Sequence, residues 1–415
     1  MFIVWSSEVR FPSFAHHQSK SYPIMQTSDP GHLFQTTAQL KQAASRERKL
    51  KAAEKIGSPI TLSSKVLALE IRDSHAFTAE SGWQARRVDL KTGKTIRLYR
   101  GHQGPVTSVA LMRIQGQKPT DILLTGSWDK TVRVWDTDTG AHLQTIEGHT
   151  DFIKSVTVIP CSPPLLLSTS SDRTCRLWDL SEVLKGDGNA RSSQILKEHT
   201  RPVECATWKA DVDKDGKPMG TFTVWTGDSL GVIKKWKVEQ GKLVYQEDVP
   251  GHETSVAKLI VAEEGLWSVS MDKMAILHPF TNASALTIPH NSYVKSILPL
   301  TSFALPNAHS LVLTGSEDED IRVWDIESQP PRLKGTIQGH CAEVSDIKPY
   351  LRERDGKPEL VVVSAGLDAT LRTWTVQHIL NPPELMYDET EEKDAVGLTE
   401  EEERELAELM SDEED

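Results

Sequence analysis

The chain lacks the features by which several large classes of protein are recognised. Its 415 residues contain no run of 18 consecutive apolar residues, so no membrane-spanning helix is expected. Four cysteines lie far apart without a metal-ligand spacing, which is typical of a protein in a reducing intracellular compartment. A Walker phosphate loop and a Gly-x-Gly-x-x-Gly fingerprint after a strand are also missing. We therefore predict no cofactor, no bound metal and no contact with a membrane.

Acidic charge is abundant, but it is concentrated at one end of the chain. Residues 388–415 contain 15 acidic residues against Lys393 and Arg404, a net charge of −13, whereas the whole chain carries −12. The rest of the chain is therefore close to neutral, which argues against an anionic surface over the whole protein. We predict a separate acidic tail at 381–415. Its stretch 398–410 has the pattern of one short helix, either disordered alone or folding on a partner.

The last residues of the tail read Ser-Asp-Glu-Glu-Asp, which acidophilic protein kinases favour, so Ser411 is a candidate phosphosite. A phosphate there would add about −1.5 to −2 of charge. We interpret the tail either as a solubilising segment or as a docking segment for a basic partner.

Two segments precede the main body of the chain. Residues 1–34 have no periodicity and contain three prolines, which predicts a disordered leader whose start is either Met1 or Met25. Residues 35–57 are rich in Ala, Gln, Lys, Arg and Glu, and carry a net charge of +4 between 41 and 55. This composition predicts a basic helical segment that ends at the following Gly-Ser-Pro sequence.

The middle of the chain is built from repeats. The stretch Leu123–Asp136 reads as two short strands around a tight turn, and the same pattern returns at 165–179, 311–325 and 360–374. Each repeat opens with a histidine, and successive histidines lie 38 to 53 residues apart. A period of this length is the signature of a repeat architecture. The histidines are His102, His149, His199, His252, His290 and His340.

A Gly-His pair, a Ser or Thr, an Asp four residues later and a final Trp-Asp make up the repeat. This pattern resembles the repeat of the WD40 family over about 320 of the 415 residues. The resemblance implies an all-β fold at 58–380, a single β-propeller of four-stranded blades with short helical or disordered extensions. Six histidine-led repeats and a degenerate one at 65–100 predict seven blades. The outer strand that closes the ring would come either from 59–63 or from 384–387.

Each complete repeat contains a histidine, a hydroxyl, an aspartate and a tryptophan. The resemblance implies that these side chains hydrogen-bond in series inside the blade, and their recurrence with the blade period argues against serine-hydrolase triads. We therefore predict structural tetrads and no enzyme activity. The tetrads are His102, Thr125, Asp129 and Trp135; His149, Ser168, Asp172 and Trp178; His290, Thr314, Asp318 and Trp324; and His340, Ser364, Asp368 and Trp374.

Two blades depart from this pattern. In the fourth, His199, Thr226 and Trp236 are present, but Leu230 stands where the aspartate is expected. In the fifth, His278 stands in place of the tryptophan. We expect weaker hydrogen-bond networks in these two blades.

In the family, the narrow face of the propeller exposes the position before the turn aspartate and those three and five after the histidine. Several of these positions hold aromatic residues or Met here, which predicts an interface. The mixture of Lys and Glu favours a protein or peptide ligand over nucleic acid. The predicted contact residues are Trp128, Phe152, Lys154, Met271, Tyr293, Lys295, Glu317, Glu343 and Leu367, with Glu204 opposite.

These patterns favour a non-enzymatic scaffold or adaptor, cytoplasmic or nuclear, that joins a multiprotein complex as a monomer and binds protein partners. One alternative is a ribonucleoprotein-associated factor, in ribosome assembly or RNA processing, that binds nucleic acid through 41–55. Another is a substrate receptor of a ubiquitin ligase. Some such receptors carry an arginine two residues after Trp-Asp, and the Trp-Asp pairs here lack it.

Overall fold

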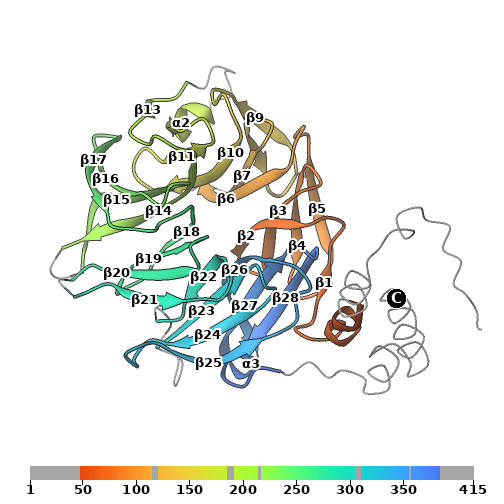
Figure 1. Ribbon diagram of the computed structural model, residues 1–415. Coiled ribbons are helices and arrows are strands. Elements are labelled where there is room, and N and C mark those ends of the chain that lie inside the picture. The colour runs from red at the N-terminus through yellow and green to blue at the C-terminus, as the bar shows by residue number, and fades with distance from the viewer. Residues whose placement is uncertain are drawn as a thin grey trace, which may run out of the picture. The chain divides into compact units, whose positions relative to one another are not determined.

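The computed structural model describes residues 47–114, 120–184, 191–213, 216–281, 283–301, 303, 310–354 and 357–383. Within these residues the strands form seven four-stranded antiparallel sheets arranged around a central axis (Figure 1). The fold is a seven-bladed β-propeller, so the predicted class and blade number are confirmed. The leader at 1–34, the candidate helix at 398–410, Ser411 and the alternative closing strand at 384–387 lie outside the described residues.

Six blades take four consecutive strands each, and the seventh borrows one strand from the start of the propeller. The first blade is β2 (Val66–Arg72), β3 (His75–Glu80), β4 (Gln84–Asp89) and β5 (Thr95–Arg100); the second is β6 (Val106–Ile114), β7 (Thr120–Ser127), β8 (Val132–Asp136) and β9 (His142–Ile146). The third is β10 (Ile153–Ile159), β11 (Leu165–Ser170), β12 (Cys175–Asp179) and β13 (Gln194–Leu196); the fourth is β14 (Val203–Val212), β15 (Pro218–Asp228), β16 (Ile233–Glu239) and β17 (Lys242–Val249). The fifth is β18 (Val256–Val261), β19 (Gly265–Ser270), β20 (Met274–Pro279) and β21 (Leu286–Pro289); the sixth is β22 (Val294–Pro299), β23 (Leu311–Ser316), β24 (Ile321–Asp325) and β25 (Arg332–Ile337). The seventh is β26 (Val344–Arg354), β27 (Lys357–Gly366), β28 (Thr370–Thr375) and β1 (Ile60–Thr61).

The hydrophobic core lies between neighbouring blades. Every residue of β11 is buried, because Leu166 packs with the second blade and Leu165 and Leu167 pack with the fourth. Trp178 of the third blade packs in one cluster with Leu124 and Val134 of the second. Full burial of each such Leu or Val side chain stabilises the fold by about 1.5–3 kcal/mol. Each blade therefore depends for its stability on the two blades beside it.

The ring is closed by β1, which pairs antiparallel with β28 in the register Ile60 to Leu371 and Thr61 to Thr370. The amide of Leu62 adds a hydrogen bond of 2.8 Å to the carbonyl of Ala369. This pairing confirms the prediction that 59–63 supplies the outer strand. With β1 in place the seventh sheet has four strands, as the other six sheets do. The edge of β28 is therefore covered and cannot pair with another chain.

The chain before β1 is attached to the seventh blade. Residues 47–53 are helical, and Ala53 is fully buried against Cys341. Arg372 donates hydrogen bonds to the carbonyls of Ala53, at 2.8 Å, and Ile56. Lys49 forms an ion pair of 2.6 Å with Glu319 of the sixth blade. The end of the predicted basic segment thus packs on the propeller.

Two short helices complete the described elements. α2 (Leu180–Val183) follows β12, and α3 (Val376–Leu380) follows β28 and packs against β25 and β28. Among the residues that the structure describes, no helix is long and apolar enough to cross a membrane.

The closing strand gives a prediction about truncation. We expect a chain that starts at residue 65 to be less stable than one that starts at residue 58, because it loses the burial of Leu62 and the pairing with β28. Burial of a leucine is worth about 1.5–3 kcal/mol and each hydrogen bond about 1 kcal/mol, so the free energy of unfolding should fall by at least about 3 kcal/mol. Urea unfolding followed by circular dichroism measures the difference. Equal stability of the two chains would contradict the role of β1.

Candidate protein interface on the narrow face

Each blade brings two loops to the same end of its sheet: the turn between its second and third strands, and the loop before its first strand. Antiparallel strands require this arrangement, and we call this end of the ring the narrow face. In the second blade the two loops are joined directly, because the amide of Trp128 donates a 3.0 Å hydrogen bond to the carbonyl of Pro105. The narrow face is therefore made of turns that are tied to one another.

The tetrad of the second blade explains why this turn is rigid. Trp135 Nε1 donates to Thr125 Oγ1 at 2.9 Å, His102 Nε2 lies 2.7 Å from the same hydroxyl, and His102 Nδ1 lies 2.7 Å from Asp129 Oδ2. Burial alone would raise the pKa of Asp129, but hydrogen bonds from His102 and Thr131 hold that pKa well below its usual range. The carboxylate stays ionised and binds the turn to the blade. The third and seventh blades make the same series, with His149 and His340 in the position of His102.

The fourth blade has a complete network, so the prediction of a missing aspartate was wrong. Asp228 Oδ2 lies 2.8 Å from His199 Nδ1, and Thr226 and Trp236 complete the series at 2.8 and 2.9 Å. Asp228 stands two residues before Leu230, where the second blade has Ser127. Its carboxylate also accepts the amides of Leu230 and Val232 and is 2% exposed. A carboxylate at either position of the turn can reach the histidine.

The fifth blade also makes every bond of the series. His252 contacts Asp272 and Ser268 at 2.8 Å each, and His278 Nε2 lies 3.0 Å from the Ser268 hydroxyl, where other blades place the indole nitrogen. The weakness expected for this blade is therefore not a loss of hydrogen bonds. The substitution instead removes volume, because an imidazole is smaller than an indole.

The predicted tetrad of the sixth blade is incomplete. His290 keeps its 2.8 Å contact with Thr314, but its Nδ1 lies 3.0 Å from the carbonyl of Ile288. Asp318 instead forms a 2.6 Å ion pair with Arg322. The residue before this histidine is Pro289, whereas the second and third blades have glycines at positive φ of 151° and 159°. A glycine there is not required, however, because Glu198 precedes His199 in the fourth blade and that series is complete. In the sixth blade Asp318 is paired with Arg322, and His290 contacts a backbone carbonyl instead.

The first blade, which has no histidine before its first strand, is held by a buried ion pair. Glu80 is fully buried and lies 2.5 Å from Arg86, which is also buried. Ser64, Thr78 and Gln84 donate further hydrogen bonds to the same carboxylate. Burial alone would raise the pKa of Glu80, but Arg86 and these donors lower it. The degenerate repeat therefore keeps a polar network of a different kind.

The structure brings the two predicted aromatic residues of the narrow face together. The rings of Trp128, on the second blade, and Phe152, before the third, stack with centroids 5.1 Å apart and planes 19° apart. Both side chains nevertheless remain 43% and 40% exposed. Stacking of this kind is worth about 0.5–1.5 kcal/mol and orders the two rings relative to each other. The pair is a preformed apolar surface at the tip of a rigid turn.

Two exposed apolar residues on the same face were missed from the sequence. Trp83 is 55% exposed in the turn of the first blade, and Leu230 is 51% exposed in the turn of the fourth. Leu230 occupies the place of the turn aspartate, and Trp83 follows Gly82, which occupies that place in the first blade. A large apolar residue at the tip of a turn was the available signal. With Trp128 and Phe152 they form an apolar arc over four consecutive blades, which we call the narrow-face arc.

Other predicted contact residues lie on the blades outside this arc. Met271 and Tyr293 are 38% and 39% exposed at the fifth and sixth blades. Glu317 is exposed and its amide donates to the carbonyl of Tyr293 at 3.0 Å, whereas Leu367 of the seventh blade is half-buried.

The predicted charged contacts are engaged in ion pairs between blades. Lys154 lies 3.1 Å from Glu204 of the next blade, and Lys295 lies 3.7 Å from Glu343. All four side chains are largely buried, so their charges are partly used to join neighbouring blades. They remain candidate contact residues. The side chains of the narrow-face arc, in contrast, are apolar and form no ion pair with a neighbouring blade.

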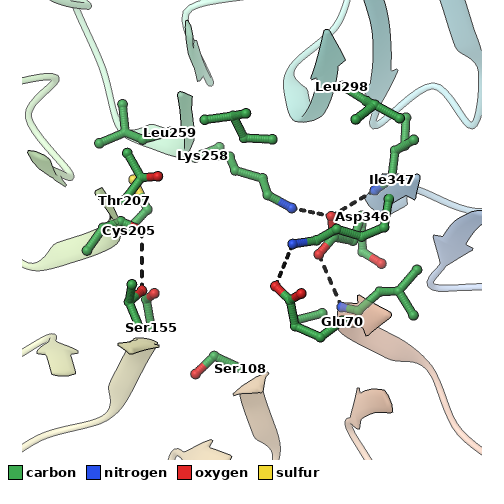
Figure 2. Close-up of a pocket in the computed structure, with 18 of the residues that line it drawn as sticks. Glu70, Ser108, Ser155, Cys205, Thr207, Lys258, Leu259, Leu298, Asp346 and Ile347 are labelled. Carbon is green, nitrogen blue, oxygen red and sulfur yellow. Dashed lines mark hydrogen bonds and ion pairs between the residues drawn. The ribbon is translucent and has the colours of Figure 1, made fainter. Parts of the chain in front are cut away.

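The central channel, a cavity of about 650 Å³, is lined by the first strand of every blade. Within it Lys258 pairs with Asp346 and Lys348 pairs with Glu70 (Figure 2). Asp346 is buried and also accepts the amides of Leu69, at 3.1 Å, and Ile347. Burial alone would lower the pKa of Lys348, but Glu70 and Asp346 raise it. These charges neutralise one another across blades, so the channel offers no field of one sign for a charged ligand.

The described part of the chain contains no group of three or more His, Cys, Asp or Glu side chains placed to hold a metal ion. The histidines of the tetrads are held in series with hydroxyls and carboxylates inside the blades. Their arrangement serves to position turns.

Comparison with known proteins agrees with this architecture. Residues 93–136, 140–179 and 286–325 match the family of the WD domain, G-beta repeat. A WD repeat-containing protein of Schizosaccharomyces pombe, itself uncharacterised, is 28% identical over 411 residues, covering 94% of this chain and all of that protein. A ribosome biogenesis protein WDR12 homolog of Ixodes scapularis is 25% identical over 300 residues, 66% of each chain. The nuclear distribution protein PAC1 of Arthroderma otae is 35% identical over 296 residues, 66% of this chain and 59% of that one.

The chain therefore contains WD40 repeats, and it is similar over most of its length to a WD repeat-containing protein. Propellers of this family generally act as non-enzymatic scaffolds that bind other proteins.

The corrected network of the fourth blade can be tested by substitution. We expect Asp228→Ala to lower the free energy of unfolding by about 2–4 kcal/mol, as Asp129→Ala should, because each leaves a buried histidine without its carboxylate. Leu230→Ala removes only an exposed side chain and should change it by less than about 0.5 kcal/mol. Urea unfolding of the three variants checks this order. A larger loss for Leu230→Ala than for Asp228→Ala would contradict the assignment.

The fifth blade gives a prediction about pH. Burial, with a smaller effect of His252, lowers the pKa of His278 to about 4, whereas an unfolded histidine titrates near about 6.5. The unfolded chain therefore takes up this proton first, so His278 reduces stability as the pH falls from about 6.5 to about 4. We expect His278→Trp to lose less stability than the wild type between pH values of about 7 and 5. Urea unfolding at both values tests this, and equal losses would show that His278 titrates normally.

Proposed function

We propose that the protein is a scaffold that binds partner proteins through the narrow-face arc of Trp83, Trp128, Phe152 and Leu230. The observation that carries this proposal is the stacked pair of Trp128 and Phe152, which stays exposed although it is held on a hydrogen-bonded turn. Exposed aromatic side chains in rigid positions are typical interface anchors. Little conformational entropy is lost when a partner covers them, because their orientation exists before binding.

The charges around the arc favour a polypeptide ligand. Lys154 lies two residues after Phe152 in the sequence and pairs with Glu204 of the next blade, so the surface carries both signs. A nucleic acid would instead favour a surface of one positive sign. Met271, Tyr293, Lys295, Glu317, Glu343 and Leu367 would extend the contact on the other blades. We place the protein in the cytoplasm or nucleus, as one copy within a larger complex, with the acidic tail available to a basic partner.

A role in ribosome assembly is a second candidate function. It is supported by two relatives that are named ribosome biogenesis proteins and are 25% and 26% identical to this chain. In this case the basic residues of 41–55 would contact RNA. RNA binding should then weaken steeply with salt and be lost when residues 35–56 are deleted. A scaffold that uses only the narrow face would keep its partners after the same deletion.

Affinity capture tests the narrow-face proposal. We expect the triple variant Trp128→Ala, Phe152→Ala and Tyr293→Ala to lose its partners, because truncation of an interface anchor typically costs at least about 2 kcal/mol. The double variant Leu143→Ala and Leu333→Ala is the matched control, since these apolar side chains are 46% and 43% exposed on outer strands. Unchanged partners with the triple variant, in a protein of unchanged thermal stability, would refute the site.

A further inference from the structure

A second apolar site lies between the fourth and fifth blades, away from the turns of the narrow-face arc. It is a cavity of about 380 Å³, within the range of ligand pockets. Its apolar walls are Trp225 and Val249 of the fourth blade and Leu266, Pro279 and Phe280 of the fifth. Lys209, Lys235 and Glu247 stand among its polar residues.

The repeats show how this cavity arises. In five blades the third strand carries a tryptophan at the gap to the preceding blade. These residues are Trp135, Trp178, Trp236, Trp324 and Trp374. Trp178 and Trp236 each pack there against the preceding blade. His278 holds the same place in the fifth blade, because it pairs with Leu266 in the register in which Trp178 pairs with Leu166. The imidazole leaves part of the indole volume empty against the fourth blade.

The neighbouring side chains fill this volume only in part. Trp225 stands where the second and third blades have Leu124 and Leu167, and its ring stacks on Phe280 with centroids 5.8 Å apart and planes 27° apart. Lys209 Nζ lies 3.8 Å from the centroid of the Phe280 ring. Phe280 remains 41% exposed, so the aromatic wall is open to an incoming group.

The hydrogen-bond series assigns the protonation of His278. Asp272 accepts from His252 Nδ1, so the neutral His252 offers Nε2 as an acceptor to the Ser268 hydroxyl. Ser268 in turn accepts from His278 Nε2, as it would from an indole N–H. The neutral His278 therefore keeps Nδ1 as a hydrogen-bond acceptor on a side chain that lines the cavity.

We propose that this cavity binds the indole ring of a tryptophan side chain supplied by a partner polypeptide. The other blades show that an indole is the group that this gap accepts, and the fifth blade has His278 at that position instead. The exposed Phe280 ring, which stacks on the buried Trp225, provides the surface for an incoming indole, and His278 Nδ1 accepts the indole N–H. Lys209 adds a cation beside the same aromatic wall.

The probes for this site are N-acetyltryptophanamide, its analogue methylated on the indole nitrogen, and free indole, each followed by ligand-observed NMR with the full chain. We expect N-acetyltryptophanamide to bind the wild type, and the methylated analogue to bind about three- to tenfold more weakly because it has no donor. His278→Trp fills the cavity and should abolish binding while the protein stays folded. Leu333→Ala, which changes an exposed apolar residue on an outer strand of the sixth blade, should leave binding unchanged.

A second variant tests the acceptor without filling the cavity. His278→Leu should bind N-acetyltryptophanamide about three- to tenfold more weakly than the wild type and no longer distinguish it from the methylated analogue. Equal binding of N-acetyltryptophanamide to the wild type and His278→Trp overturns the site. If the wild type binds free indole but does not bind N-acetyltryptophanamide, the assignment of the site to a polypeptide ligand is overturned. Neither result depends on the narrow-face arc, whose partners are measured separately.

Discussion

A buried imidazole held between a hydroxyl and a carboxylate is the interaction on which the surface of this propeller depends. Left without partners, each buried polar group would cost about 1–3 kcal/mol, so the histidine, hydroxyl and aspartate are stable only together. Because the aspartate lies in the turn and the hydroxyl in the sheet, satisfying the histidine also attaches the turn to the blade. The side chains at the tip of that turn are thereby free to differ without loss of the fold.

Most of the fold could be predicted because each repeat contains the pattern of its own blade. Blade number, strand order and the closing role of 59–63 all follow from the period and from the need to pair an outer strand. The failures occurred where one local substitution was compensated by a neighbour. Asp228 stands where the second blade has a serine and contacts the histidine, while in the sixth blade Asp318 pairs with Arg322 and His290 contacts a backbone carbonyl. Such exchanges depend on the distances between side chains in the folded turn. These distances cannot be read from the spacing of residues in the sequence.

The candidate site was predictable to a lesser degree. Trp128 and Phe152 could be placed side by side, because the family pattern assigns both to adjacent loops. Trp83 and Leu230 could not, since they occupy positions that the pattern reserves for other roles. The charged residues Lys154 and Lys295 show the opposite error, because exposure on a face does not reveal an ion pair with the next blade. Lys154 and Lys295 pair with neighbouring blades, whereas Trp128 and Phe152 stay exposed.

The pairing of β1 with β28 has a consequence for how the chain is made. Ile60 and Leu371 are paired in space but lie at opposite ends of the propeller sequence. The entropy cost of closing this long loop must be met before their contact can stabilise the fold. During synthesis β1 emerges first and has to wait, without its partner, until the last blade has left the ribosome. Six blades can assemble in order as they appear, but the seventh cannot. Completion of the ring is therefore a late event, and β1 is the strand that stays unpaired and exposed until then.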